Sequence, residues 1–302
     1  MEDIAKQKMN REDYPHLYRV ADSLSIKHQK RHFRLLFGYL MLLLLGATIS
    51  FIAANTTLKV IAIIIFIASS GLYFISKLLN PMSLWYNGRA VAESVKTMTW
   101  KWMMCASPYQ TERLANPSDP FIENLQELFK ENKTLFKYYH DGNENNDDDC
   151  LYCISDKMRL IRRGSSSQKL EFYNKQRVEE QSKWYKKKAK YNHTKYIIFS
   201  SATGACYIII IALMIIDITN PSKWFPVEIL SVLIASLISW IEAKQYNELA
   251  SSYSLTVSDI SLIKKDKLEG QVGVDIVCDY VINSETAFSR EHTQWIARKN
   301  NN

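Results

Sequence analysis

The residues of this chain that could do chemistry are few and scattered. Cys150 and Cys153 have the C-x-x-C spacing of half a zinc site, but no second pair completes the four-ligand set. The nearest histidine, His140, lies in a polar stretch. Residues 141–149 (DGNENNDDD) could bind a cation, but they lack the ordered spacing and the closing glutamate of a calcium loop. We expect a solvated loop and no metal site here.

The remaining motifs of enzymes are also missing from the sequence. Glu291 and His292 form an isolated pair on an expected helix, where a surface position is the simpler interpretation. There is no Gly-rich phosphate loop and no nucleophile elbow. The five cysteines are scattered and odd in number, which predicts reduced thiols rather than a disulfide framework. We therefore predict no catalytic residues, no cofactor and no enzymatic activity.

Two long apolar stretches dominate the first half of the chain. Residues 35–58 contain no charged side chain, and residues 60–76 form a second apolar run after Lys59. A helix needs about 20 apolar residues to cross a bilayer. The sequence predicts a transmembrane hairpin with spans at about 35–54 and 60–79. A buried core of a soluble protein is the alternative, although two such pure and adjacent runs are unusual there.

The second half of the chain repeats this arrangement. Residues 196–216 are again uncharged, and residues 224–241 form a shorter apolar run with Pro226 and Glu228 near its start. Trp224 lies where an interfacial aromatic anchor is expected, so we predict a fourth span at about 224–241. In each half a charged helix leads into the hairpin and an amphipathic helix leads out. Identity between the halves is weak, so the repeat is one of architecture.

The fold class predicted from these features is all-α, an integral membrane protein with two transmembrane hairpins and long cytosolic amphipathic helices. The predicted domains are a first two-span unit (1–140), a polar linker (141–157) and a second two-span unit (158–302). Outside the spans, helical spacing or apolar content predicts helices over about 84–104, 121–139, 158–196, 246–263 and 272–298.

Positive charge predicts how the spans are oriented. Of the 38 Lys and Arg residues, only Lys59 and Lys223 lie at the two hairpin turns. Because cytoplasmic segments carry the excess of Lys and Arg, both termini and residues 77–195 are predicted to face the cytosol. The net charge of +7 is thus explained by topology, and no nucleic-acid partner is predicted. The juxtamembrane basic run that includes Lys186, Lys187 and Lys188 is a topology determinant or, in addition, a contact to anionic lipid headgroups.

Small residues recur every four positions within the spans. Such faces let helices approach closely in lipid. They pack within one chain, or they pack between chains and line a pore; the candidates are Gly46, Ser50, Ala54, Ser200, Gly204, Ser231, Ala235 and Ser239. No Asp, Glu, Lys, Arg or His lies deep in the four spans, which disfavours a coupled transporter or proton relay. A conducting path would therefore need several subunits, and a homo-oligomer is predicted.

Aromatic and charged side chains recur on the predicted cytosolic helices. They pack in the helices' own interfaces or, in the sharper interpretation, contact a partner. The candidates for the cytosolic interface are Trp85, Arg89, Glu93, Trp100, Arg177, Trp184, Tyr185, Tyr246, Tyr253 and Trp295.

Three strings within these helices resemble a known family. Residues 87–100 (NGRAVAESVKTMTW), followed by Pro108 and Tyr109, resemble the exit helix of one subfamily of SLATT proteins, the SMODS- and SLOG-associated two-transmembrane effectors. Residues 173–192 (YNKQRVEEQSKWYKKKAKYN) resemble the entry helix of a second subfamily, and residues 289–295 (SREHTQW) are similar to the end of that subfamily. Together the two units cover most of the chain.

The resemblance implies a multi-pass effector of the bacterial inner membrane, in a defence or conflict system. Such an effector is proposed to permeabilise the membrane when a nucleotide-generating or nucleotide-sensing partner triggers it. The resemblance brings no catalytic residues. The alternative is a non-conducting membrane scaffold or sensor that recruits a soluble partner through its cytosolic helices. An enzyme acting on lipid or nucleotide is the third class, disfavoured because the sequence shows no site.

Overall fold

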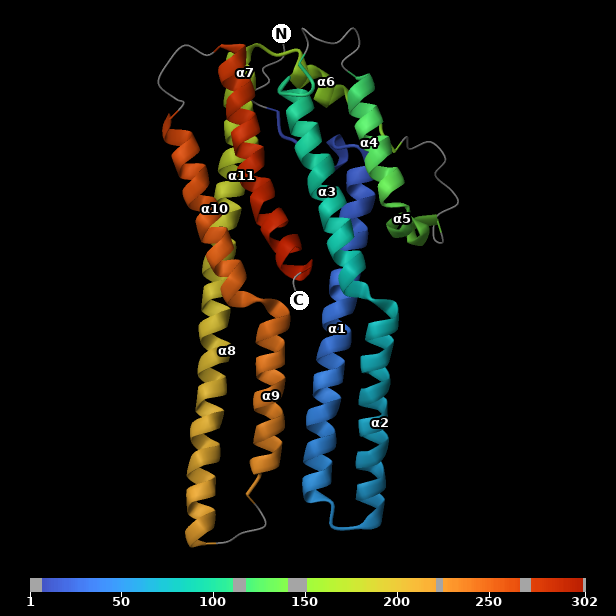
Figure 1. Ribbon diagram of the computed structural model, residues 1–302, viewed down its shortest axis with the longest axis vertical. Helices are drawn as coiled ribbons and strands as arrows, with labels where there is room; N and C mark the ends of the chain where they lie inside the picture. The colour runs from blue at the N-terminus through green and yellow to red at the C-terminus, as the bar shows by residue number, and fades with distance from the viewer. Residues whose placement is uncertain (1–6, 111–117, 141–150, 221–224, 267–272, 301–302) are drawn as a thin grey trace. The chain divides into compact units, whose positions relative to one another are not determined.

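The computed structural model describes residues 7–110, 118–140, 151–220, 225–266 and 273–300. Every regular element among them is helical, as predicted (Figure 1). The elements are a short 3-10 turn η2 (Arg11–Asp13), the helices α1 (His16–Ile52), α2 (Thr56–Leu79), α3 (Pro81–Met103), α4 (Asp119–Glu131), α5 (Lys133–His140), α6 (Asp156–Arg162) and α7 (Ser166–Tyr173), the π-helical segment η4 (Asn174–Glu179), and the helices α8 (Glu180–Thr219), α9 (Val227–Lys244), α10 (Tyr246–Asp266) and α11 (Val274–Asn300).

Three of the four predicted spans lie in helices that are long and apolar enough to cross a membrane. The helical runs His16–Ile52, Thr56–Met103 and Ser166–Thr219 each contain a window of mean hydropathy 2.2 or 2.3. The fourth predicted span forms α9, whose 18 residues include Glu228, Glu242 and Lys244. Those charges lie in the first and last turns of α9, so its membrane-crossing role stays a prediction.

Each hairpin continues into its exit helix through a single residue in the left-handed region. Asn80 has φ 36° between α2 and α3, and Gln245 has φ 49° between α9 and α10. Asparagine tolerates this conformation well, and Pro81 then starts α3 at the first helical position, where proline needs no N–H partner. Both halves thus place one left-handed residue between the second helix of the hairpin and the exit helix, which is a structural feature that the two repeats share.

The helices outside the spans are more broken than the sequence predicts. Residues 121–139 were expected to form one helix, but Asn132 ends α4, and α5 begins one residue later. The Asn132 side chain donates a hydrogen bond to the carbonyl of Leu128, which occupies a backbone acceptor of the helix (2.9 Å). Residues 158–196 likewise divide into α6, α7, η4 and α8, because Ser165 begins a new helix with a capping box to Gln168.

The chain divides into two compact units that do not follow the order of the sequence. Unit 1 contains the described residues within 1–28, 83–187 and 252–302. Its core holds the largest fully buried side chains, among them Trp100, Trp102, Tyr109 and Phe121. The Phe121 ring on α4 packs against Trp102 and Tyr109, with ring centroids 5.6 and 5.7 Å apart. Unit 1 is therefore built like a soluble helical bundle around an aromatic core.

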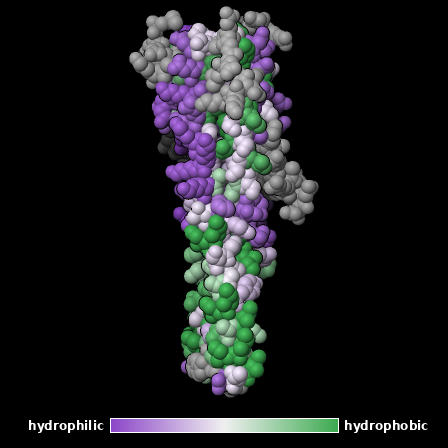
Figure 2. Space-filling view, turned by 90° about the vertical axis from the view of Figure 1, so that its left-hand side faces the viewer, coloured by the Kyte–Doolittle hydropathy of each residue, from purple (hydrophilic) through white to green (hydrophobic). Residues whose placement is uncertain are grey.

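Unit 2 contains residues 29–82 and the described residues within 188–251, which include the predicted spans. Within its first hairpin α2 packs on α1, where the Ser69 hydroxyl donates to the carbonyl of Tyr39 (3.3 Å) and the Phe66 ring covers Gly46. Large apolar side chains stay exposed: Ile67 is 66% exposed and Ile208 70%. Figure 2 shows hydrophobic side chains gathered over the helices of this unit. Exposure on this scale suits a surface that faces lipid.

Candidate functional site

A buried carboxylate, Glu285, is the centre of the polar interior of unit 1. Its side chain is 1% exposed, and its two oxygens accept four hydrogen bonds. Oε1 accepts from the Tyr173 hydroxyl (2.9 Å) and Arg177 Nε (2.8 Å). Oε2 accepts from Arg177 Nη2 (2.8 Å) and the Thr97 hydroxyl (2.8 Å). Because an ionised carboxylate accepts about four hydrogen bonds, this group is saturated.

Four elements supply this Glu285 network. Thr97 lies on α3, Tyr173 at the end of α7, Arg177 in η4 and Glu285 on α11. Three of the four lie within the strings that carry the family resemblance, and Glu285 precedes the third string by four residues. The network therefore joins the exit helix of the first half to the entry and terminal helices of the second.

The π-helical segment η4 holds Arg177 in the interior of unit 1. Single π turns within α-helices are rare and recur at functional sites. Arg177 is 2% exposed and makes a bidentate pair with Glu285, and its guanidinium lies 4.9 Å from the Phe288 ring centroid. Burial lowers the pKa of Arg177, but the Glu285 carboxylate outweighs burial and raises it. Arg177 Nη1 has no hydrogen-bond acceptor among the described residues.

Aromatic side chains enclose the network. The Trp100 indole donates to the Tyr14 hydroxyl (3.1 Å), and its ring packs on Phe172 and Tyr173. Burial, together with the charge of Glu285, raises the pKa of the Tyr173 phenol. Burial also raises the pKa of Tyr280, to about 12. Both phenols thus stay protonated and available as donors at neutral pH.

This arrangement is suited to joining helices. The donors of the chain itself engage all four acceptor positions of the Glu285 carboxylate. Removing one partner of such a buried pair leaves an uncompensated charge, so the geometry of the four elements depends on the whole set. The network can hold unit 1 in one packing and resist others.

Lys96 lies next to this network on α3. It is partly buried, and burial followed by repulsion from Arg177 lowers its pKa to about 8. Glu93, Arg89 and Glu285 also act on it, with the two carboxylates opposing the shift.

We expect Lys96→Met to raise the free energy of unfolding at pH 7 by about 1 kcal/mol, a value discounted for partial exposure. The folded state disfavours the ammonium, so the penalty is fully present below pH 8 and fades as pH rises toward 10.5. The advantage of Lys96→Met should therefore shrink over that window in thermal melts of the full chain in detergent. Lys96→Arg, which stays charged, should keep the penalty throughout; an identical pH response of wild type and Lys96→Arg would refute the assignment.

The predicted small-residue faces are placed differently in the two hairpins. Gly46 is buried against Phe66, whereas Gly204 has open space where a Cβ would lie. Among the remaining candidates Ser200 is partly buried, and Ser50, Ala54, Ser231, Ala235 and Ser239 are exposed. Packing within the chain thus uses Gly46 and leaves the stripe of α9 on the surface of unit 2.

The predicted cytosolic candidates lie mostly in the chain's own packing. Trp100, Arg177, Tyr185, Tyr246 and Tyr253 are buried, Trp85, Arg89, Glu93 and Trp184 are partly buried, and Lys186, Lys187 and Lys188 are exposed. Tyr253 contacts Trp184 and Tyr185, with ring centroids 5.4 and 5.6 Å apart, and Tyr246 stacks on Phe199. Trp295 and the residues 141–149 lie outside the side chains that the structure describes. The alternative of packing within the chain accounts for the buried members.

Sequence reasoning missed Glu285, Tyr173 and Thr97 as members of one site. A signal for Glu285 was present: with Val277, Val281 and Phe288 it falls at helical spacing on the buried face of α11. A lone acid on an apolar face predicts a buried partner. For metals, no cluster of three or more His, Cys, Asp and Glu occurs among the described residues, and Cys150 lies outside them.

Comparison with known families divides the chain in two. Residues 15–170 match the model of SMODS and SLOG-associating 2TM effector domain 3, and residues 173–295 match that of SMODS and SLOG-associating 2TM effector domain 1. No curated protein and no solved structure matches the chain. The second match begins at Tyr173, the first member of the Glu285 network in that half.

Proposed function

This chain belongs to the SLATT family, with two different SLATT domains in tandem, and from that premise we propose that it is an effector that oligomerises and permeabilises the bacterial inner membrane when triggered. SLATT domains are effector domains associated with bacterial conflict and defence systems. Oligomerisation, the membrane path and the trigger are our proposal. No enzymatic step is part of it.

The observation that carries the proposal is the exposed small-residue face of unit 2. Ser231, Ala235 and Ser239 recur every four residues on α9, and all three are exposed in the single chain. Gly204 on α8 likewise meets no neighbour. Since small residues let helices approach closely in lipid, these faces suit contact with another copy of the chain. Four helices of one copy enclose little space, so a path would form between copies.

The proposed topology has four spans, with both termini in the cytoplasm. The excess of Lys and Arg outside the hairpin turns supports it, as does the apolar surface of unit 2. Glu228 and Lys244 would then lie at opposite membrane surfaces, because they occupy the two ends of α9. Unit 1 would be cytosolic.

Unit 1 is the proposed receiver of the trigger, which comes from a nucleotide-generating or nucleotide-sensing protein partner. The Glu285 network supports this assignment, because it joins helices of both SLATT domains in one packing. α1 and α8 each contribute residues to both units. A change of packing in unit 1 would therefore be carried into unit 2 along continuous helices.

We expect Gly204→Leu to abolish membrane depolarisation in bacteria that express the chain together with its trigger. Within one chain the leucine has room, so protein level and insertion should be unchanged, but a second helix could no longer approach. Membrane potential and dye entry are the readouts, and protease access to both termini from the cytoplasmic side confirms insertion and topology.

Ile208→Leu is the matched control, because Ile208 is an exposed large residue one turn away on the same helix and the change conserves volume. It should depolarise like the wild type. Gly46→Leu is less informative, since the new side chain would collide with Phe66 and disturb the hairpin itself. A triggered wild type that binds a cytosolic partner but leaves the potential intact would rule out permeabilisation and favour a non-conducting scaffold.

A further inference from the structure

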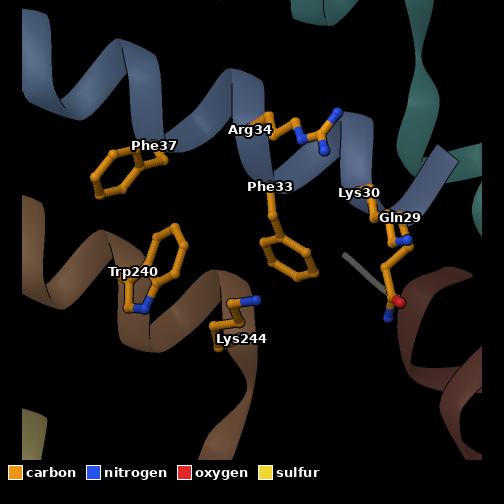
Figure 3. A pocket seen from close by; sticks show the side chains of 7 residues that line it. All are labelled: Gln29, Lys30, Phe33, Arg34, Phe37, Trp240 and Lys244. Carbon is orange, nitrogen blue, oxygen red and sulfur yellow. The ribbon is translucent and has the colours of Figure 1, made fainter. Parts of the chain in front are cut away.

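A pocket between α1 and α9 in unit 2 combines cations with aromatic rings. Its volume is about 460 Å³. Five lining residues come from two turns of α1 and two from the last turns of α9 (Figure 3): Gln29, Lys30, Phe33, Arg34, Phe37, Trp240 and Lys244. Three of the seven carry a positive charge and none is acidic. The pocket is therefore a site of positive potential with an apolar wall.

The aromatic wall is a packed structure. Phe33 and Phe37 point from α1 toward α9 (Figure 3), and each ring meets Trp240 edge to face, with centroids 6.0 and 6.1 Å apart. Lys244 Nζ lies 3.2 Å from the Phe33 ring centroid and 4.9 Å from the Trp240 ring centroid. These two cation–π contacts hold the ammonium at the pocket instead of leaving it free in solvent.

The chemical character of the pocket lining changes along the direction of the helices, from apolar to cationic. Phe37 and Trp240 belong to the predicted first and fourth spans, whereas Gln29, Lys30 and Lys244 lie beyond their cytosolic ends. In the proposed topology Phe37 and Trp240 would thus lie at the cytosolic ends of the spans, where the acyl chains begin, and Lys30 and Lys244 at the depth of the headgroups. A phospholipid has the same order of chemistry, with phosphate outside and hydrocarbon inside.

We propose that this pocket binds the phosphate-bearing headgroup of an anionic phospholipid from the cytosolic leaflet. Lys30, Arg34 and Lys244 would contact the phosphate, and Phe37 and Trp240 the first part of the acyl chains. Basic pockets between transmembrane helices on the cytoplasmic side are suited to such headgroups. The proposal rests on the topology proposed above, because it requires α9 to be at membrane depth.

One further observation agrees with positive potential at this point: burial, and after it the charge of Lys244, lowers the pKa of His32 on α1. Burial also lowers the pKa of Lys244 itself. A bound anion would offset the cost of holding Lys244 charged in a partly buried place. The basic run with Lys186, Lys187 and Lys188 differs from this pocket, since its side chains are exposed.

The test uses the full chain purified in a mild detergent and native mass spectrometry to count bound phospholipid. Phosphatidylglycerol is the probe, phosphatidylcholine the zwitterionic comparison and inorganic phosphate the competitor. We expect the chain to retain phosphatidylglycerol in preference to phosphatidylcholine. The double variant Arg34→Gln/Lys244→Gln should lower its affinity about tenfold or more, because two charge-assisted contacts are lost.

Lys186→Gln/Lys187→Gln is the control, since it removes the same charge from the exposed run. It should leave retention close to wild type. Equal loss in both double variants would overturn the proposal in favour of a diffuse charge effect. Equal retention of phosphatidylcholine would reduce the pocket to an apolar groove, and full displacement by millimolar inorganic phosphate would make it a site for free anions.

This result can be separated from failure of the proposed function. Lipid retention does not depend on conduction, so a chain that binds phosphatidylglycerol but never depolarises cells supports the pocket alone. Extraction of the chain from membranes without detergent would refute the topology. Trp240→Leu gives an independent check, since it removes the indole from the aromatic wall but no charge, and should weaken phosphatidylglycerol retention while leaving the oligomeric state unchanged.

Discussion

Glu285→Gln should lower the stability of unit 1 by about 3–5 kcal/mol, although it changes only one atom of the side chain. The amide keeps the shape of the carboxylate but removes its charge, so Arg177 becomes a buried cation without a counter-ion. The NH₂ group of the new amide also replaces an acceptor oxygen, so it faces the donors of Arg177, Thr97 and Tyr173. We expect the melting temperature of the full chain in detergent, monitored by near-ultraviolet circular dichroism, to fall by about 10 °C.

Glu93→Gln is the matched control on α3. Its carboxylate pairs with Arg89 one turn away at 3.0 Å, and both side chains are substantially more exposed than those of the Arg177–Glu285 pair. Pairs one turn apart on a partly exposed helix face contribute about 0.5 kcal/mol or less. If Glu285→Gln lost no more stability than Glu93→Gln, the Glu285 network could not be what fixes the packing of unit 1.

A double variant separates the contribution of the Arg177–Glu285 charge pair to stability from the contribution of the hydroxyl contacts around it. Arg177→Met/Glu285→Leu removes both charges and fills similar volume, so it should recover a large part of the stability that Glu285→Gln loses. Recovery should be incomplete, because the hydroxyls of Thr97 and Tyr173 then lack their acceptor. A double variant as unstable as the single one would show that the hydroxyl contacts matter more than the charge pair.

The sequence predicts the helical class and three apolar spans because these depend on local composition. An uncharged run of about 20 residues has few alternatives to a membrane helix, and Asn80–Pro81 marks a break whatever surrounds it. The fourth span stays a prediction for the same reason: its end turns carry Glu228, Glu242 and Lys244, and local composition alone does not decide it.

The Glu285 network could not be predicted because its members meet only through tertiary packing. Thr97 and Glu285 are 188 residues apart in sequence, and Tyr173 and Glu285 are 112 apart. Arg177 was a candidate as an interface residue, yet the π-helical η4 places it inside. The sequence shows no pattern that indicates a π turn, so it left open whether Arg177 packs within the chain or contacts a partner.

The pocket between α1 and α9 also could not be predicted, because it too forms only through tertiary packing. Lys30 and Arg34 precede the first predicted span, in the N-terminal segment whose Lys and Arg content predicts a cytosolic location. Their proximity to Trp240 and Lys244 requires the two hairpins of unit 2 to pack together, which no local pattern encodes. In the proposed topology the residues that orient the first span would thus also line the proposed lipid site.

Gly88→Ala should destabilise unit 1 by about 1–3 kcal/mol, the second large effect that the structure predicts. Gly88 lies on α3 in the string that carries the first family resemblance, and α3 crosses α1 there at backbone distance. A Cβ would come within 3.1 Å of the Ala21 carbonyl oxygen, 3.1 Å of the Ser25 nitrogen and 3.2 Å of Ser25 Cα. These are backbone atoms, so no side chain can rotate away, and α3 itself must move.

The sign of this effect distinguishes packing from helix propensity. In an unhindered helix, replacing glycine by alanine gains about 1 kcal/mol. Gly71 on α2 supplies that comparison, because a Cβ there meets no atom within 4 Å. We expect Gly71→Ala to raise or preserve the melting temperature of the full chain in detergent and Gly88→Ala to lower it. A gain at both positions would mean that α3 and α1 are not in backbone contact, and Thr97 and Trp100 on the same helix would then lose the support that places them at Glu285 and Tyr14.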